Sequence, residues 1–168
     1  MKMIFKTIFL FVFVSTVLQA HSMIKNSTDI KKSGKPIMVL FSTKTCPYCE
    51  VFKKDIKEHK ELNSLAKDFE IYEIKRDEQH DYTMWGKKTN LKTLEMTFAI
   101  KATPNTIVFD KKGRKIWQVP GYMPTKQFLI TLDFMKSKKW VGKDRKNGEV
   151  YEELKKYYIS NGIEVNKK

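Results

Sequence analysis

The sequence is poor in the residues that define several protein classes. It contains two cysteines, seven glycines and five prolines among 168 residues. Two cysteines form at most one intrachain disulfide, which excludes a disulfide-stapled miniprotein and a four-thiolate zinc site. So few glycines and prolines, beside 12% aromatic residues, exclude collagen, a coiled coil and a fully disordered chain. The length suits one ordinary domain with a hydrophobic core.

The first twenty residues differ from the remainder of the chain. Lys2 and Lys6 precede an almost unbroken apolar stretch over residues 7–18, and Ala20 supplies a small residue after it. This pattern is typical of a secretory signal peptide. The apolar stretch is shorter than the roughly 20 residues that cross a bilayer, although an uncleaved anchor stays the alternative. We expect residues 1–20 to be removed after Ala20 and the mature protein to reside in the periplasm.

Acidic residues are scarce relative to basic ones. The chain has 33 lysines and arginines against 19 acids, which gives a formal net charge of +14. Such an excess attracts an anionic neighbour. For an exported domain, we expect this neighbour to be an anionic membrane surface or an acidic partner rather than a nucleic acid.

Beyond the leader, the hydrophobic pattern alternates between strand and helix. Residues 37–41 are apolar without interruption, which is typical of a strand buried on both faces. Apolar residues then recur at helical spacing over residues 46–59 and predict a helix. The segment before the first strand, residues 21–35, is mostly polar and favours a short helix or a linker.

The rest of the chain continues this alternation. The next strand is expected to have one partly exposed face because of Glu70 and Glu73, and the polar residues 76–90 favour an irregular surface insertion. Later elements are expected in the order helix, hairpin, helix and helix, over residues 91–98, 106–119, 124–135 and 150–158. Together they predict an α/β fold with a central mixed sheet flanked by helices. We place this domain at residues 36–139 and a C-terminal helical extension at residues 140–168.

The residues that carry chemistry are Cys46-Pro47-Tyr48-Cys49, between the apolar strand and its helix. Cysteines three apart on a first helical turn lie within the Cα separation of a disulfide. Cys46 would meet the unpaired N–H groups and positive dipole end of the helix, which favour a thiolate, and Lys44 would add to this effect. We therefore expect Cys46 to be the more acidic and accessible thiol and Cys49 to resolve mixed disulfides. Pro47 stiffens the first turn.

A CxxC spacing alone also fits half of a metal site, a structural disulfide or a chance occurrence. The strand before it and the helix after it favour redox chemistry. Three methionines, Met84, Met96 and Met123, offer soft ligands for Cu(I) beside the cysteines, but methionines are more often packing residues. The three histidines are scattered along the chain. We therefore expect neither a metal nor a cofactor.

Three further segments add to this pattern. They are Phe41–Cys49 (FSTKTCPYC), Ala102–Asp110 (ATPNTIVFD), and Gly113 followed by Gly121-Tyr122. In this order, across residues 33–138, they resemble the thioredoxin-fold family and are most similar to exported thioredoxin-like proteins of the SoxW type. The resemblance implies a thioredoxin-like fold. It also implies that Pro104 follows a cis peptide bond and faces the two sulfurs, and that the backbone of Thr103 pairs with a bound substrate strand.

The chain departs from thioredoxin itself at several positions. Leu40 stands where thioredoxin has a buried aspartate that helps to deprotonate the second cysteine. Water, a carboxylate such as Glu50, or the substrate must then accept that proton. Thr45 replaces a tryptophan, Lys54 replaces a kinking proline, and Pro47-Tyr48 is a glutaredoxin-like pair. Exchange proteins of this fold span reduction potentials from about −270 to −120 mV, so the direction of electron flow stays open.

The resemblance implies an exported thiol–disulfide oxidoreductase that reduces disulfides of other exported, cysteine-containing proteins and is recharged by a membrane thiol donor. Cys46 would attack the substrate, and Cys49 would displace the product. The residues expected to contact substrate are Thr103, Pro104, Pro47 and Tyr48. The alternatives are a disulfide oxidase or isomerase, a Cu(I) carrier using the same cysteines, and a disulfide-dependent binding module without turnover.

Two surface patterns complete the predictions. Trp85 lies in the expected insertion and is a candidate for a partner surface. The paired lysines are expected to lie on solvated faces. These pairs are Lys53-Lys54, Lys87-Lys88, Lys111-Lys112 and Lys138-Lys139.

Overall fold

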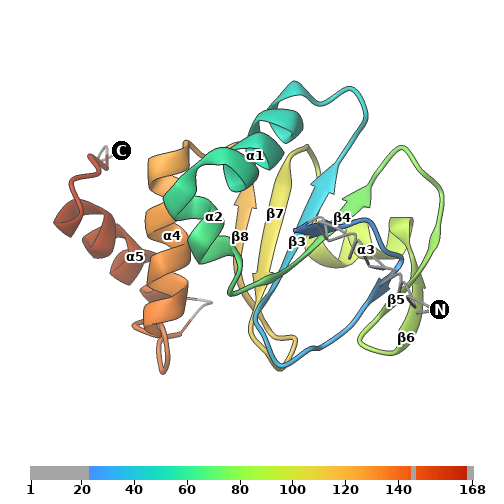
Figure 1. The fold of residues 1–168 in the computed structure, drawn as a ribbon. Coiled ribbons are helices and arrows are strands. Elements are labelled where there is room, and N and C mark those ends of the chain that lie inside the picture. Colours follow the sequence, from blue (N-terminus) through green and yellow to red (C-terminus); the bar gives the residue numbers. More distant parts are fainter. Residues whose placement is uncertain (1–22, 145–146, 166–168) are drawn as a thin grey trace, which may run out of the picture.

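A five-stranded mixed sheet forms the centre of the computed structural model, which describes residues 23–144 and 147–165 (Figure 1). The strand order is β1-β4-β3-β7-β8. β1 and β3 run parallel to β4, whereas β7 is antiparallel to β3 and β8 is antiparallel to β7. The strands are β1 (Ile24–Lys25), β3 (Ile37–Ser42), β4 (Glu70–Lys75), β7 (Asn105–Phe109) and β8 (Lys115–Pro120).

Helices cover both faces of this sheet, as expected for the fold class. The helices are α1 (Pro47–Glu58), α2 (Lys60–Ala66), α3 (Leu91–Phe98), α4 (Thr125–Ser137) and α5 (Glu149–Ser160). Apolar side chains of α1, α2, α4 and α5 share one core cluster, and those of α3 belong to a second cluster on the opposite face (Figure 1). β3 lies between these clusters, so all six of its residues are buried. This position explains its uninterrupted apolar pattern.

The expectation of a helix or linker over residues 21–35 was wrong for the part that the structure describes. Ile24–Lys25 pairs with β4, and β2 (Asp29–Ile30) pairs with β5 (Asp81–Met84). Ile30 is fully buried in the second core cluster. Tertiary pairing overrides the polar composition here, because a two-residue strand needs only a neighbouring edge and one buried side chain.

The expected irregular insertion over residues 76–90 was also wrong. It contains a hairpin of β5 and β6 (Lys87–Asn90), which forms a three-stranded sheet with β2. Trp85 and Gly86 connect the strands with φ angles of 57° and 78°, the left-handed backbone that tight hairpins require. Trp85 packs edge-on against Phe109 at 5.4 Å between ring centroids. This partly buried tryptophan therefore packs against the second core cluster.

The C-terminal helix is part of the main core. Val150, Leu154 and Tyr158 are buried in the cluster that α4 also enters. The hydroxyl groups of Thr131 and Tyr158 lie 2.5 Å apart, which ties α4 to α5. The boundary expected at residue 140 thus separates elements of one folded unit.

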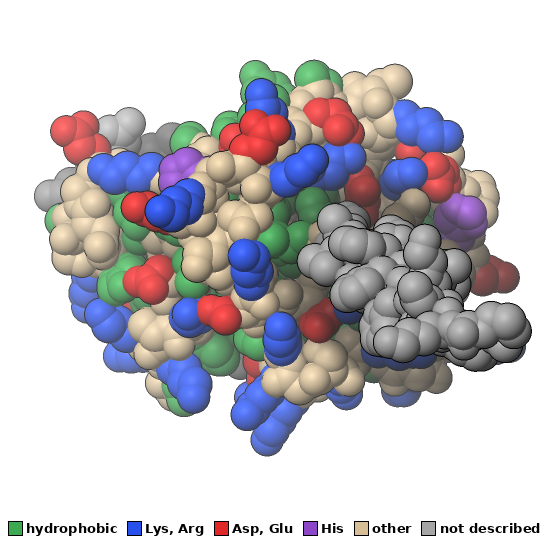
Figure 2. All heavy atoms as spheres, in the orientation of Figure 1, with side chains coloured by type: hydrophobic (Ala, Val, Ile, Leu, Met, Phe, Trp, Pro, Cys, Tyr) green, Lys and Arg blue, Asp and Glu red, His purple; other side chains and the backbone are tan. Residues whose placement is uncertain are grey.

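On the face shown in Figure 2, the basic side chains are scattered and do not form one positive patch. Lysine and arginine side chains there are interleaved with acidic ones. Within the described ranges, no helix has the length and apolar character needed to cross a bilayer. The expected signal peptide, residues 1–20, lies outside the described residues.

Candidate redox site

The Cys46–Cys49 pair lies where the central strand passes into its helix. β3 ends at Ser42, and Cys46 is the residue that caps the N-terminus of α1. The two sulfurs form a disulfide of 2.09 Å, with the Cα atoms 5.3 Å apart. This Cα separation lies within the ordinary range for disulfides. The pair therefore occupies a site that the chain forms locally, from one loop and one helical turn.

The first turn of α1 directs a backbone donor at the Cys46 sulfur. Cys49 N donates to Cys46 Sγ at 3.2 Å, and Cys46 has the extended backbone typical of a cap. Pro47 occupies the first turn, where a missing N–H costs no helical hydrogen bond. In the reduced protein, the same donor and the helix dipole favour a thiolate on Cys46.

The two sulfur-bearing residues differ in exposure, although by less than expected. Cys46 is 7% exposed and Cys49 is completely buried. Cys46 is therefore the more accessible of the two residues. Beside it, the ring of Tyr48 is 60% exposed and stacks on Tyr122 with 5.7 Å between centroids.

Three loops converge at the disulfide. Cys46 N donates to Thr43 O, and the Thr43 hydroxyl lies 3.5 Å from that of Thr103. The Thr103–Pro104 peptide bond is cis, as the resemblance implied. Pro104 O accepts a hydrogen bond from Gly121 N at 2.8 Å, which joins the third loop. Thr103, Pro104, Pro47 and Tyr48 are thus brought to one end of the sheet.

Tyr122 also anchors this end to the helix. Its hydroxyl donates to Asp55 Oδ2 at 2.8 Å, and the Thr125 hydroxyl donates to the same oxygen at 2.9 Å. Burial, together with the Asp55 carboxylate, raises the pKa of Tyr122. The sequence contained no signal for Asp55, since its partners lie 67 and 70 residues away.

A buried carboxylate lies on the α1 side of the sheet near the disulfide. Glu73 is the register partner of Leu40, and it is 8% exposed. Its Oε1 accepts from Ser42 Oγ at 2.7 Å and from Lys53 Nζ at 3.1 Å. Ser42 lies two residues beyond Leu40 on β3, so the carboxylate leans toward the cysteine end of the strand.

Lys53 connects this carboxylate to the helix that bears the cysteines. It stands one turn after Cys49 and also contacts Glu50 at 2.6 Å. Burial acts to lower the pKa of Lys53, but hydrogen bonds to Glu50 and Glu73 outweigh it and raise that pKa. A cavity of about 210 Å³ borders the pair and reaches Thr43.

Two expectations about these charges need correction. Glu73 does not lie on an exposed strand face, and Lys53 is half-buried rather than solvated. Glu50, named above as one of the acceptors for the Cys49 proton, has a side chain that is 65% exposed and paired with Lys53. Lys44 directs its ammonium to Glu78 at 3.5 Å. Sequence patterns missed Glu73 because its partners come from elements 20 and 31 residues away.

The residues considered as metal ligands are dispersed. Met84 is buried in the second core cluster, whereas Met96 is exposed. Met123 Sδ accepts from Thr131 Oγ1 at 3.3 Å, and His59 caps α2. Among residues 23–144 and 147–165, no three His, Cys, Asp or Glu side chains are grouped as a metal site requires.

The fold and this site define the class of protein. Residues 25–136 match the model of the thioredoxin-like domain family. The chain belongs to this family. A search of curated protein sequences finds no match.

Solved structures give the same fold. A thioredoxin-fold protein from Helicobacter pylori is 28% identical, with a TM-score of 0.76, over 83% of this chain and 93% of that one. A thioredoxin from Thermus thermophilus is 19% identical, with a TM-score of 0.50, over 67% of this chain and 85% of that one. The second similarity concerns the fold alone.

Proposed function

We propose that this protein is an exported thiol–disulfide oxidoreductase that reduces disulfides in other exported proteins. The observation that carries the proposal is the Cys46–Cys49 disulfide at the start of α1, beside the loop that contains Pro104. The family membership supports the chemistry. The leader pattern and the resemblance to SoxW-type proteins support the export and the reducing direction.

The reaction transfers two electrons from the dithiol to the substrate. The Cys46 thiolate attacks one sulfur of a substrate disulfide, and the other substrate sulfur leaves as a thiolate that takes up a proton. A mixed disulfide now joins Cys46 to the substrate. Cys49 loses its proton and attacks the Cys46 sulfur, which releases the second substrate thiol. The protein then holds the Cys46–Cys49 disulfide, and a membrane dithiol donor must reduce it again.

The loops around the disulfide suit an extended peptide. Tyr48 and Val51 are exposed apolar side chains on α1, and Thr103 is partly exposed on the loop opposite. An extended substrate can add its backbone beside Thr103, while Tyr48 and Tyr122 contact its side chains. Recognition through backbone contacts accommodates many cysteine-containing clients.

Glu73, which Lys53 joins to α1, accepts the Cys49 proton in this mechanism. Cys49 is completely buried, so its proton needs an acceptor near the site. Glu73 and Asp110 are the buried carboxylates in the described ranges, and Asp110 lies at the opposite end of β3. Glu73 lies under α1 and is joined to it by Lys53, one turn from Cys49. We therefore assign Glu73 the role of accepting the Cys49 proton, which thioredoxin gives to the buried aspartate at the position of Leu40.

Disulfide reduction by the two cysteine variants tests the proposal. Cys46→Ser should abolish insulin reduction, because the attacking sulfur is lost. Cys49→Ser should accumulate mixed disulfides with client proteins, because the first step proceeds and the second cannot. Full turnover by Cys46→Ser would refute the mechanism. A wild-type protein that binds clients yet never exchanges disulfides would instead be a binding module.

The direction of electron flow needs a separate measurement. Equilibrating the protein with glutathione gives the stability of its disulfide. A reductase should prove strongly reducing, near the thioredoxin end of the range of about −270 to −120 mV. A value near the upper end would assign the protein to the oxidases. Membrane fractionation of the native protein then shows whether it is released into the periplasm or held at an anionic membrane surface.

A further inference from the structure

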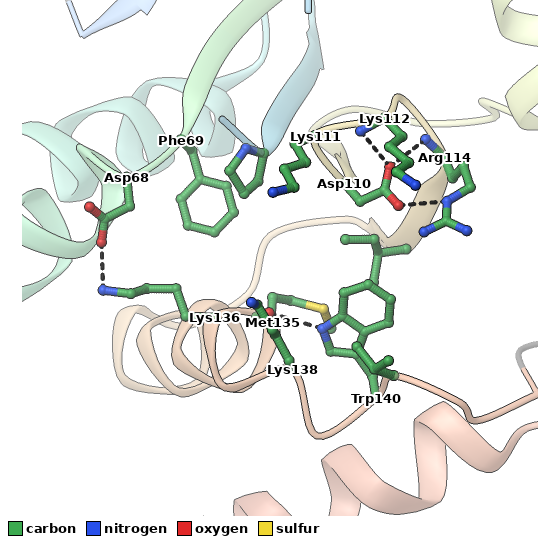
Figure 3. A pocket seen from close by; sticks show the side chains of 13 residues that line it. Asp68, Phe69, Asp110, Lys111, Lys112, Arg114, Met135, Lys136, Lys138 and Trp140 are labelled. Atoms are coloured by element: carbon green, nitrogen blue, oxygen red, sulfur yellow. Dashed lines mark hydrogen bonds and ion pairs between the residues drawn. The ribbon is translucent and has the colours of Figure 1, made fainter. Parts of the chain in front are cut away.

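A second cavity lies at the end of the sheet opposite the disulfide (Figure 3). Its volume is about 400 Å³, which lies in the range of small-molecule sites. It is bounded by Pro36 before β3, by the β7–β8 turn and by the chain after α4. β3 separates it from the cysteines by roughly 20 Å, at about 3.3 Å per residue. Nothing in the disulfide chemistry uses it.

The floor of this cavity is apolar. Figure 3 shows Phe69, Met135 and Trp140 facing a common space from three segments of the chain. Each is almost completely buried, as is Ile116 on β8. The Trp140 indole N–H donates to Met135 O at 2.9 Å, so its ring offers an apolar surface to the cavity. A hydrocarbon group placed here would leave water without leaving a polar atom unpaired.

The rim, in contrast, has an excess of positive charge. Its two acids already have partners. Asp110 accepts from Arg114 Nε at 2.7 Å, and Asp68 contacts Lys136 at 2.5 Å. Three more lysines line the cavity, and their ammonium groups have no hydrogen bond or ion pair within the part of the chain described. These are Lys111, Lys112 and Lys138.

We propose that this cavity binds a free amphipathic carboxylate of the medium-chain fatty acid class. The hydrocarbon chain lies on the floor beside Trp140, and the carboxylate meets the unpaired lysines at the rim. Lysine ammonium groups on flexible stems hold such a head group as mobile point charges. The concave shape favours a single free molecule, because a bilayer is contacted by apolar side chains that protrude.

Titration of the protein with decanoate, followed by the NMR signals of the Met135 methyl group and the Trp140 indole, tests the proposal. Decanol and decyltrimethylammonium are matched ligands that keep the chain and change the head group. We expect saturable binding of decanoate, about tenfold weaker binding of decanol and still weaker binding of the cation. Equal affinity for all three, or no saturation with decanoate, would overturn the proposal.

Charge variants localise the site. Lys111→Gln/Lys112→Gln/Lys138→Gln should weaken decanoate binding by about tenfold, because the head group loses its partners. Lys87→Gln/Lys88→Gln/Lys92→Gln removes the same charge from β6 and α3 and should leave binding unchanged. Equal weakening by both variants would show a general effect of net charge and refute the site.

Three further experiments separate the alternatives. Val141→Glu places an anion at the exposed rim without disturbing the core, and it should also weaken binding. Vesicles of anionic phospholipid should not compete with decanoate, and competition would assign the cavity to the membrane instead. Cys46→Ser should bind decanoate normally, so the outcome does not depend on the proposed redox function.

Discussion

Two carboxylates are buried equally, each 8% exposed, at opposite ends of the central sheet, and their partners differ in kind. Asp110 is held by its own turn, since it accepts from the backbone N–H groups of Lys112 and Arg114, both at 2.9 Å. Glu73 is held by a strand and a helix that are distant in sequence. The local set stabilises a hairpin. The distant set places a charge pair under the helix that bears the cysteines.

Among the variants that compare Glu73 with Asp110, replacement of Glu73 should have the largest effect on the redox reaction. Glu73→Gln keeps the hydrogen bond to Ser42 but removes the proton acceptor, so release of the mixed disulfide should slow by about 10²-fold, the lower range for acid–base catalysis. The measurement is the single-turnover rate at which Cys49 displaces a substrate thiol from Cys46.

A conservative variant distinguishes catalysis from structure at this position. Glu73→Asp retains a carboxylate and should recover part of the rate. If Glu73→Gln lowers only the unfolding free energy and leaves the release rate unchanged, the residue is structural and the assigned role fails. Lys53 retains Glu50 as a partner in either variant, so it is not left as an isolated buried charge.

In contrast to Glu73→Gln, Asp110→Asn should lower the stability of the protein and leave its redox activity unchanged. Loss of the Asp110 carboxylate removes charge-assisted bonds that close the β7–β8 turn, and the unfolding free energy should fall by about 1–3 kcal/mol. Insulin reduction should be unchanged below the melting transition, because the turn lies at the far end of β3. Denaturant unfolding measures the change in stability, and insulin reduction measures the activity. A loss of activity under conditions in which the variant is fully folded would contradict the prediction.

The same aspartate should contribute a pH-dependent part of stability. Burial acts to raise the pKa of Asp110, but hydrogen bonds from Arg114 and Lys112 outweigh it and hold the pKa below its ordinary value. Its stabilisation is therefore complete above the ordinary aspartate pKa and is lost as the pH falls through the lowered one. Unfolding free energies of wild type and Asp110→Asn should converge in acid, and a constant difference would argue against this.

The smallest expected effect is a loss of stability when the hydrogen bond between Tyr122 and Asp55 is removed. These residues are distant in sequence and lie at the disulfide end of the sheet. Tyr122→Phe removes the hydrogen bond to Asp55 but keeps the ring that stacks on Tyr48, so stability should fall by about 0.5–1.5 kcal/mol with little change in turnover. Tyr157→Phe, which removes a bond to Asp133 on α4, is a matched control far from the cysteines. A large loss of turnover in Tyr122→Phe alone would show that its hydroxyl contacts the substrate.

Much of the fold was predictable because its signals are local. The apolar run of β3, the helical spacing of α1 and the turn before Gly113 depend on neighbouring residues, and the structure confirms all three. Gly113 has a φ of 83°, the left-handed backbone that its turn requires. The cysteine pair belongs to this group, since one helical turn sets its separation.

The errors have a common physical cause. Residues 21–35 were expected to form a helix or a linker, and residues 76–90 an irregular insertion, because their strands are short and polar. Pairing with distant edges decided the structure of β1, β2, β5 and β6. The paired lysines looked alike, yet the half-buried Lys53 pairs with the buried Glu73 while Lys111, Lys112 and Lys138 surround an apolar cavity. Periodicity records which face of an element is apolar, but not what another element places opposite a polar residue.

For this protein, the sequence by itself determined the family, the cysteine pair and the helix start that Cys46 caps, because their signals lie in short segments of neighbouring residues. Only the tertiary structure decided which carboxylate lies beneath that helix and where the unpaired lysines gather. Those placements arise when strands and helices far apart in the chain pack together, and burial then determines which charges find partners.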